Sequence, residues 1–455
     1  MDKKLPISAY LIIGLLLFSL FFGGGNLIFP AYLGQLSGTN MWIAVAGFLV
    51  TGVGLPLLAI IAIGISGVDN VQPLAARVHP VYGIAYTVLL YLTIGPFFAL
   101  PRTGTVSYEI GVAPFIGEDN HLIKLLIYTI LFFGISLWLS LNPTRIVDRI
   151  GKILSPLMLL FIAVIIIMSF VNPLGSQSMP QEGYDSAAFV NGFLQGYNTL
   201  DALGGLAFGI LIINSVKLYG QKSKKAIFTS VLKSGVIGVG LLALVYIFVA
   251  YIGSTSVTAL GLADNGAPIL SGASKHYMGT LGQILLAFII IIACLTTSVG
   301  LTSACAAYFY KLVPKFSYKT YAIVFTLFSA CVANVGLSNL ITYSTPVLLF
   351  LYPITIVLIL LVLADSAFKS RRVVYICTMV STLLMSFVEG IHGFGISLGA
   401  IDNILAKYVP FYDLSMGWIT FALFGFIVGC IIASVTTEKP AEETEASLAG
   451  ETNLK

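Results

Sequence analysis

The chain has 455 residues, of which 58% are hydrophobic and only 9% are charged, and its formal net charge is +4. Soluble domains carry roughly 25% charged residues, so a soluble globule is excluded, as is nucleic-acid binding through a basic block. The five cysteines and four histidines show no metal-ligand spacing, so we expect the cysteines to be small buried hydrophobes and predict no metal centre.

Apolar runs long enough to cross a lipid bilayer recur along the chain and predict about twelve transmembrane helices. The first run follows Lys3 and Lys4 but continues well past a signal-peptide core, so we interpret it as a membrane span. The expected spans are 8–36, 41–66, 81–112, 122–141, 149–171, 187–216, 227–253, 281–311, 319–336, 339–364, 372–390 and 414–435. The sequence therefore predicts an all-α polytopic membrane protein, with one transmembrane domain over 1–437 and a disordered tail over 438–455.

Positive charges are distributed unevenly between alternate loops. The loops on the side of the N-terminus carry Lys3, Lys4, Arg77, Arg145, Arg149, Lys152, Lys217, Lys222, Lys224, Lys225, Lys311, Lys315, Lys319, Lys369, Arg371 and Arg372, and those on the other side carry Lys124, Lys275 and Lys407. Because lysine and arginine favour the cytoplasmic side, we predict a multi-pass protein of the cell membrane with both termini in the cytoplasm. That orientation requires an even number of spans.

The first span contains the sequence Gly23-Gly24-Gly25-Asn26, followed by Pro30. Three glycines and a proline disfavour a continuous helix, and unwinding would free backbone amides and carbonyls at bilayer depth. The positive end of the following half-helix suits an anionic group, and the freed carbonyls suit a cation. Close helix packing through glycine is the alternative.

The third span carries Pro96, Pro101 and Arg102, with Glu109 near its other end. An arginine within a span is costly and is expected to pair inside the bundle. Arg102 and Glu109 are candidates for a gating pair, and a structural ion pair or snorkelling is the alternative.

The sixth span contains a second polar interruption, residues 196–205 (GYNTLDALGG). An aspartate within a span marks function by default. Packing through small residues explains Gly205 and Gly209 but leaves Asn198 and Asp201 unexplained. Four intact spans separate this interruption from the first, which predicts an inverted-repeat transporter with its site at the midplane. The repeats would be about 8–171 and 187–364, with two additional helices over 372–435.

The eighth span places Ala293, Thr296, Thr297 and Gly300 on one helical face. Two hydroxyl oxygens and a carbonyl beside a small residue suit a hard monovalent cation. Threonines that bond back to their own helix are the alternative. Near the eleventh span, residues 395–399 (GISLG) match the hydrolase nucleophile elbow, but the strand–turn–helix context of that motif is absent, so we interpret them as a polar loop.

Three segments resemble the branched-chain amino acid:cation symporters, the branched-chain amino acid transport system II carriers of the amino acid–polyamine–cation superfamily. They are 22–30 (FGGGNLIFP), 95–103 (GPFFALPRT) and 197–203 (YNTLDAL). The resemblance extends from about Lys3 to the end of the twelfth span. It implies a five-plus-five inverted-repeat fold with broken helices 1 and 6, shared with the bacterial leucine transporter.

The resemblance also implies binding residues. Backbone amides of the first break would hold the substrate carboxylate, and the family's sodium site uses two helix-1 carbonyls and three helix-8 positions. The substrate-binding residues would be Gly23, Gly24, Gly25, Asn26, Tyr197, Asn198, Asp201 and Gly204, and the Na⁺ residues Ser19, Phe22, Ala293, Thr296 and Thr297. Asp201 stands where many sodium-coupled relatives carry a small polar residue, which leaves open whether it binds the substrate ammonium, a cation or a proton.

The sequence-based conclusion is a secondary transporter that imports leucine, isoleucine and valine by symport with Na⁺ or H⁺ through alternating access. An uncoupled neutral amino acid exchanger of the same fold is the alternative. No phosphate loop or cytoplasmic domain is apparent, so we expect no nucleotide, no other cofactor and no enzymatic activity.

Overall fold

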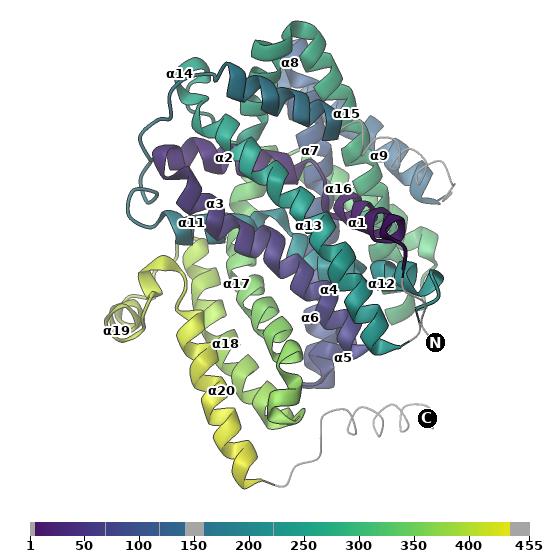
Figure 1. The fold of residues 1–455 in the computed structure, drawn as a ribbon, viewed down its shortest axis with the longest axis vertical. Coiled ribbons are helices and arrows are strands. Elements are labelled where there is room, and N and C mark those ends of the chain that lie inside the picture. Colours follow the sequence, from purple (N-terminus) through teal and green to yellow (C-terminus); the bar gives the residue numbers. More distant parts are fainter. Residues whose placement is uncertain (1–4, 69, 118, 142–158, 222, 437–455) are drawn as a thin grey trace.

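The computed structural model describes residues 5–68, 70–117, 119–141, 159–221 and 223–436, and these are mostly helical, with the longest non-helical connection over 172–187 (Figure 1). The α-helices are α1 (Ile7–Phe21), α2 (Gly25–Ser37), α3 (Met41–Leu49), α4 (Leu55–Ser66), α5 (Val71–Ala76), α6 (Pro80–Leu92), α7 (Ala99–Gly111), α8 (Ala113–Ile116), α9 (His121–Leu141), α11 (Ala188–Gln195), α12 (Asp201–Leu218), α13 (Lys224–Ser254), α14 (Val257–Leu260), α15 (Gly266–Leu312), α16 (Tyr318–Ala333), α17 (Leu337–Leu363), α18 (Arg372–Gly393), α19 (Ala400–Tyr408) and α20 (Trp418–Val435). A further apolar helix covers Leu159–Val171. Short 3₁₀-helices are η1 (Gly38–Asn40), η4 (Gly196–Thr199), η5 (Asp365–Phe368) and η6 (Tyr412–Leu414), and short π-helices are η2 (Val50–Gly54) and η3 (Thr93–Phe97).

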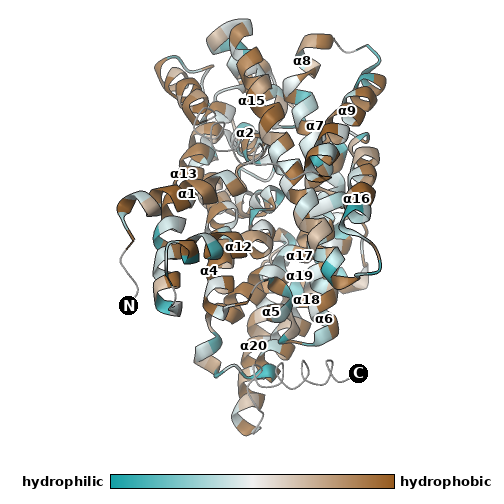
Figure 2. Cartoon of the chain, turned by 90° about the vertical axis from the view of Figure 1, so that its right-hand side faces the viewer, coloured by the Kyte–Doolittle hydropathy of each residue, from teal (hydrophilic) through white to brown (hydrophobic). Residues whose placement is uncertain are grey.

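Within the described residues, nine helical segments are long and apolar enough to cross a membrane. Large apolar side chains remain exposed along them, for example Leu122, Ile123, Leu126, Ile127 and Ile130 on α9. Hydrophobic residues likewise cover most of the helices in Figure 2. Such a continuous apolar exterior fits lipid and not water. The prediction of an all-α polytopic membrane protein is therefore confirmed.

The number of twelve spans and the inverted repeat stay predictions. The first half of the fifth expected span (149–158) and the tail (438–455) lie outside the described residues. Three of the shorter apolar helices, α1, α16 and Leu159–Val171, fall on expected spans 1, 9 and 5.

Helical irregularities are more frequent than the sequence predicted. The second span passes through a π-helical turn, η2, and the third passes through another, η3, in which Gly95 has non-helical angles (φ −98°, ψ −121°). Such π-turns are frequent at functional sites. They lie where spans 2 and 3 pass the centre of the bundle, and the interior is therefore built from interrupted helices.

The elements around the two expected breaks pack together in the middle of the molecule. α2 packs against α13 and α15, α7 packs against α15, and α12 packs against α4. The additional helices α18 and α20 lie on one side of this group, next to α17 (Figure 1). The helix ends at the two breaks are thus packed against α4, α13 and α15.

Candidate functional site

The first span is interrupted at the expected glycines. α1 ends at Phe21, Phe22 is extended (φ −75°, ψ 101°), and α2 begins at Gly25. The Asn26 side chain closes the gap, because its Oδ1 accepts a hydrogen bond from the Gly23 N–H at 2.9 Å. The Asn26 and Leu27 N–H groups in the first turn of α2 donate to the Gly23 and Gly24 carbonyls at 3.1 and 3.3 Å, so the break itself supplies acceptors for this turn.

The sixth span is interrupted as well. α11 ends at Gln195, η4 makes one tight turn, and α12 begins at Asp201 after Leu200, which is left-handed at φ 62°. A left-handed non-glycine residue costs roughly 1–2 kcal/mol and is typically retained where the surroundings require it. Both predicted breaks are confirmed.

A buried polar cluster joins the two breaks. Asn26 Nδ2 donates to Asp201 Oδ2 at 2.7 Å, and the Tyr246 hydroxyl donates to the same oxygen at 2.8 Å. Asn26 Nδ2 also contacts the Tyr246 hydroxyl. All three side chains are buried. Tyr246 lies on α13 and was not predicted, because one tyrosine among 22 in an apolar span gives no local signal.

Arg102 crosses from α7 to the second break. Its Nη1 donates to the Asn198 carbonyl at 2.6 Å and its Nη2 to Ser344 Oγ at 3.1 Å, while the guanidinium lies 4.9 Å from the centre of the Phe29 ring. Glu109 instead lies 3.8 Å from His121 Nε2. The structure therefore does not join Arg102 and Glu109 as the expected gating pair, because the two side chains turn to different neighbours.

A cavity of about 80 Å³ lies between the two breaks, α7 and α15. Of the predicted residues, its walls include Gly23, Gly24, Gly25, Asn26, Asp201, Gly204, Arg102 and Thr297. Its other walls are mostly apolar, and include Ile94, Val106, Leu200, Phe208 and Leu301. The structure therefore brings the polar residues of both breaks to one small space with an apolar remainder, which is the usual character of a small-molecule site.

Tyr197 and Asn198 lie beside this cavity but do not line it. The Tyr197 ring stacks on Tyr352 of α17 with the ring centres 4.2 Å apart, and its hydroxyl has no partner in the described structure. The Asn198 carbonyl accepts from Arg102, and its side chain donates to Gln195 Oε1 at 3.0 Å. Both residues therefore form part of the second break without lining the cavity.

The expected cation residues on α15 are arranged around one carbonyl. Thr296 Oγ1 and Thr297 Oγ1 donate to the Ala293 carbonyl at 2.9 and 3.0 Å. This is the back-bonded arrangement that was the structural alternative, and it leaves lone pairs on both hydroxyl oxygens. Thr297 faces the first break, because a Cβ on Gly23 would lie 3.4 Å from Thr297 Oγ1. The Ser19 and Phe22 carbonyls as partners of this group stay a prediction.

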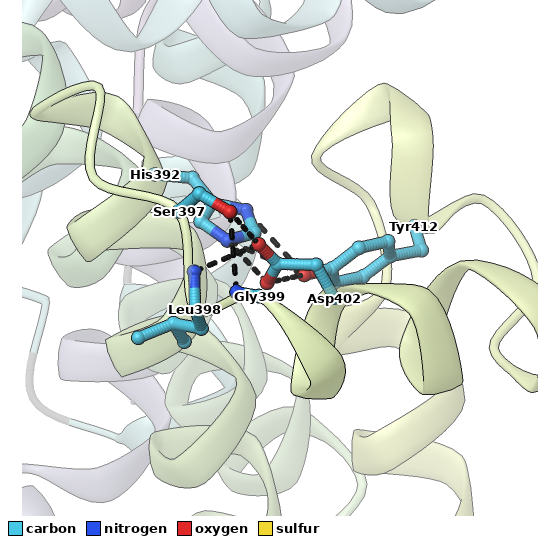
Figure 3. A network of polar contacts seen from close by, with 6 residues as sticks. All are labelled: His392, Ser397, Leu398, Gly399, Asp402 and Tyr412. Atoms are coloured by element: carbon cyan, nitrogen blue, oxygen red, sulfur yellow. Dashed lines mark hydrogen bonds and ion pairs between the residues drawn. The ribbon is translucent and has the colours of Figure 1, made fainter.

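The GISLG segment forms a loop between α18 and α19, as predicted. Asp402 lies between its two neighbours there: His392 Nε2 is 2.8 Å from Asp402 Oδ1, and Ser397 Oγ donates to Asp402 Oδ2 at 2.7 Å (Figure 3). A hydrolase triad needs the histidine next to the serine. This order of residues holds a loop together and does not activate a nucleophile.

The sequence is similar to that of known proteins over almost the whole length of the chain. Residues 7–436 match the family described as branched-chain amino acid transport protein. The chain is 48% identical to the branched-chain amino acid permease BrnQ of Bacillus subtilis, over 96% of this chain and 100% of that protein. It is 43% identical to the branched-chain amino acid transport system 2 carrier protein of Pseudomonas aeruginosa, over 90% and 92% of the two chains.

Solved structures share the fold at low sequence identity. The crystal structure of MhsT in complex with L-phenylalanine superposes with a TM-score of 0.56 at 16% identity, covering 96% of this chain and 99% of that one. The inward-facing conformation of Mhp1 superposes with a TM-score of 0.61 at 12% identity, covering 95% of each chain. At these identities the likeness concerns the arrangement of helices alone.

Proposed function

Because the chain belongs to the family of branched-chain amino acid transport proteins, we propose that it imports leucine, isoleucine and valine by symport with Na⁺ or H⁺. The family consists of membrane transporters, so the chain is a transporter and not an enzyme. The observation that supports the proposed site is the cavity that Gly23, Gly25 and Asp201 line between the two broken helices. We place the protein in the cell membrane with both termini cytoplasmic, on the distribution of lysine and arginine between loops.

Substrate binding at this cavity follows from the ends of two helices. The N-terminus of α2 lies at the cavity, because Gly25 and Asn26 line it, and a helix N-terminus favours an anion such as an amino acid carboxylate. The apolar walls would accept an aliphatic side chain, and their burial from water favours branched over polar side chains. A cavity of about 80 Å³ holds on the order of six water molecules, which favours small substrates.

Coupling would arise at α15. A cation held by the Ala293 carbonyl, Thr296 and Thr297, with carbonyls of Ser19 and Phe22, would tie α1 to α15. Closing that contact orders the first break, on which substrate binding depends, so cation and substrate would each favour binding of the other. Alternating access would then consist of movement of the broken helices against the intact ones, with the five-plus-five repeat as its frame.

The test is uptake of radiolabelled leucine into proteoliposomes with Na⁺ and pH gradients imposed separately. A symporter accumulates leucine against its concentration gradient under one of these two ion gradients. The uncoupled exchanger predicts equal counterflow with no ion gradient and no accumulation under either. Competition by isoleucine and valine, but not by glutamate or lysine, checks the substrate class.

A further inference from the structure

Arg102 is a buried cation without a carboxylate partner in the described part of the chain. Its side chain is 4% exposed and lines the cavity. A guanidinium has five N–H donors, of which only one goes to the Asn198 carbonyl and one to Ser344. The Nε donor is buried and has no partner. Burying a charge without compensation is costly. An anion that accepts hydrogen bonds from the remaining N–H donors of Arg102 would therefore be stabilised here.

The position of Arg102 places those donors at the first break. A Cβ on Gly25 would lie 4.0 Å from Arg102 Cδ, so the arginine runs beside the first residue of α2. The helix N-terminus and the guanidinium thus meet at the same end of one cavity. Both attract a carboxylate, and arginine binds carboxylates through two parallel hydrogen bonds.

The opposite charge lies on another wall of the same cavity. The Asp201 side chain is 5% exposed, and its neighbours Asn26 and Tyr246 are neutral and both donate to the oxygen Oδ2, while the neutral Thr199 hydroxyl also bonds to this carboxyl group. No ion pair joins Asp201 to Arg102 within the described residues, although both line the cavity. The cavity therefore presents one buried guanidinium group and one buried carboxyl group that are not paired with one another.

We propose that Arg102 binds the α-carboxylate and Asp201 the α-ammonium of the substrate, so that the site requires both charges of a zwitterionic α-amino acid. The inference rests on the proposed binding of an amino acid at this cavity. It assigns Arg102 to the substrate and not to a gate. It also gives the site a rule for rejection: a ligand with one charge leaves the other buried charge unpaired.

The carboxylate half is tested on Arg102→Gln with leucine and leucinamide, which keeps the ammonium and lacks the carboxylate. Ligand-induced thermal stabilisation of the purified protein reports binding without transport. We expect the wild-type protein to bind leucine at least about tenfold more tightly than leucinamide, as a charge-assisted hydrogen bond implies. In Arg102→Gln this preference should disappear, with leucinamide binding unchanged. A variant that keeps the full preference would overturn the assignment.

The ammonium half is tested on Asp201→Asn with 4-methyl-2-oxopentanoate, which keeps the carboxylate and lacks the ammonium. The wild-type protein should reject this compound, and the variant should lose its preference for leucine over it. If the variant keeps that preference and instead needs a higher Na⁺ or H⁺ concentration, Asp201 serves the cation and this half of the proposal fails.

Ser344→Ala is the matched control for the structural contacts of Arg102. This substitution removes one hydrogen bond of Arg102 and leaves its charge, so the preference for leucine over leucinamide should persist. Loss of that preference would mean that Arg102 serves only to hold neighbouring helices together. Arg102→Lys, which keeps the charge but not the planar fork, should retain part of the preference and serves if Arg102→Gln does not fold. Should leucine not stabilise the wild-type protein while another α-amino acid does, the branched-chain assignment fails, and the charge test is repeated with that amino acid and its amide.

Discussion

The three consecutive glycines of the first break have different surroundings. A Cβ on Gly24 would lie 2.7 Å from both Cys294 Sγ on α15 and Val106 Cγ1 on α7, closer than Cβ atoms are found. A Cβ on Gly25 would meet the Phe29 ring at 3.4 Å and Arg102 Cδ at 4.0 Å, without a clash. Gly24 is therefore required for helix approach, the structural alternative considered for this motif, while Gly25 is free to serve the ligand.

We predict that Gly24→Ala destabilises the protein by about 1–3 kcal/mol, the usual cost of overpacking, and weakens leucine binding through the displaced helices. Gly25→Ala is the matched control and should keep the wild-type unfolding temperature. Thermal unfolding of the purified variants measures the difference. Equal unfolding temperatures for the two variants would contradict the packing role of Gly24.

The threonines of α15 are the second prediction at this scale. Thr296→Val and Thr297→Ala each remove a hydroxyl oxygen beside the Ala293 carbonyl. If these oxygens bind the coupling cation, the cation concentration for half-maximal uptake should rise roughly tenfold or more, since a bond to a charged group contributes about 1.5–3 kcal/mol.

Ser298→Ala is the control on the same helix, because Ser298 bonds to Ser136 of α9 at 2.7 Å and does not line the cavity. Its cation dependence should match the wild type. Unchanged dependence in both threonine variants would leave the hydroxyls with their back-bonding role alone.

At the scale of elements, α19 is held to the end of α18 by one carboxylate. Asp402 accepts hydrogen bonds from Ser397, the Leu398 N–H and Tyr412, and pairs with His392 (Figure 3). Partial burial raises the pKa of the Asp402 carboxyl, but these hydrogen bonds outweigh it and lower the pKa to about 2. Because the folded-state pKa lies below the ordinary value near 3.9, the stabilisation is complete at neutral pH and is lost only as the pH falls from about 4 through about 2.

We predict that Asp402→Asn, which mimics the protonated carboxyl at neutral pH, increases hydrogen–deuterium exchange across residues 394–412. Ile401, Ile404 and Tyr408 on α19 are exposed, whereas Leu405 packs partly buried against the core, so we expect the Asp402 contacts to supply a large part of what holds this helix. Asp413→Asn, at an exposed neighbouring aspartate, is the control. Wild-type exchange in Asp402→Asn would show that the loop is held by its backbone contacts.

At the scale of the whole molecule, a cluster of polar side chains connects the segment that follows α5 to the segment that follows α17. Arg77 is 5% exposed, lies 3.3 Å from Asp365 and donates to the Tyr375 hydroxyl at 2.9 Å, and this hydroxyl donates to Asp365 at 2.7 Å. Arg372 adds hydrogen bonds to the Val78 carbonyl at 3.2 and 3.3 Å. These contacts connect the two predicted repeats and the start of the additional helices at one place.

We predict that Asp365→Ala lowers stability by about 1–3 kcal/mol, the cost of depriving buried polar groups of a partner, measured as a lower thermal unfolding temperature. The leucine affinity of the folded variant should stay near that of the wild type, because these residues do not line the cavity. A wild-type unfolding temperature would mean that Arg77 is held by its other contacts.

The sequence by itself determined which segments are helical, that they lie in a membrane, and where the first and sixth spans break. Each of these depends on local composition: twenty apolar residues span a bilayer, and clustered glycine, proline and asparagine interrupt a helix wherever it lies. The residues of the two breaks, Gly23 to Asn26 and Asp201, line the cavity, and their roles in binding stay predictions.

Only the tertiary structure decided the partners of those residues. Tyr246 is 45 and 220 residues from Asp201 and Asn26, and Arg102 selects the Asn198 carbonyl, 96 residues away, over the expected pairing with Glu109. The difference between Gly24 and Gly25 depends likewise on how closely α7 and α15 approach. Helix packing sets such contacts across the chain, and no periodicity or local motif encodes which side chain of a distant helix will fill a given space.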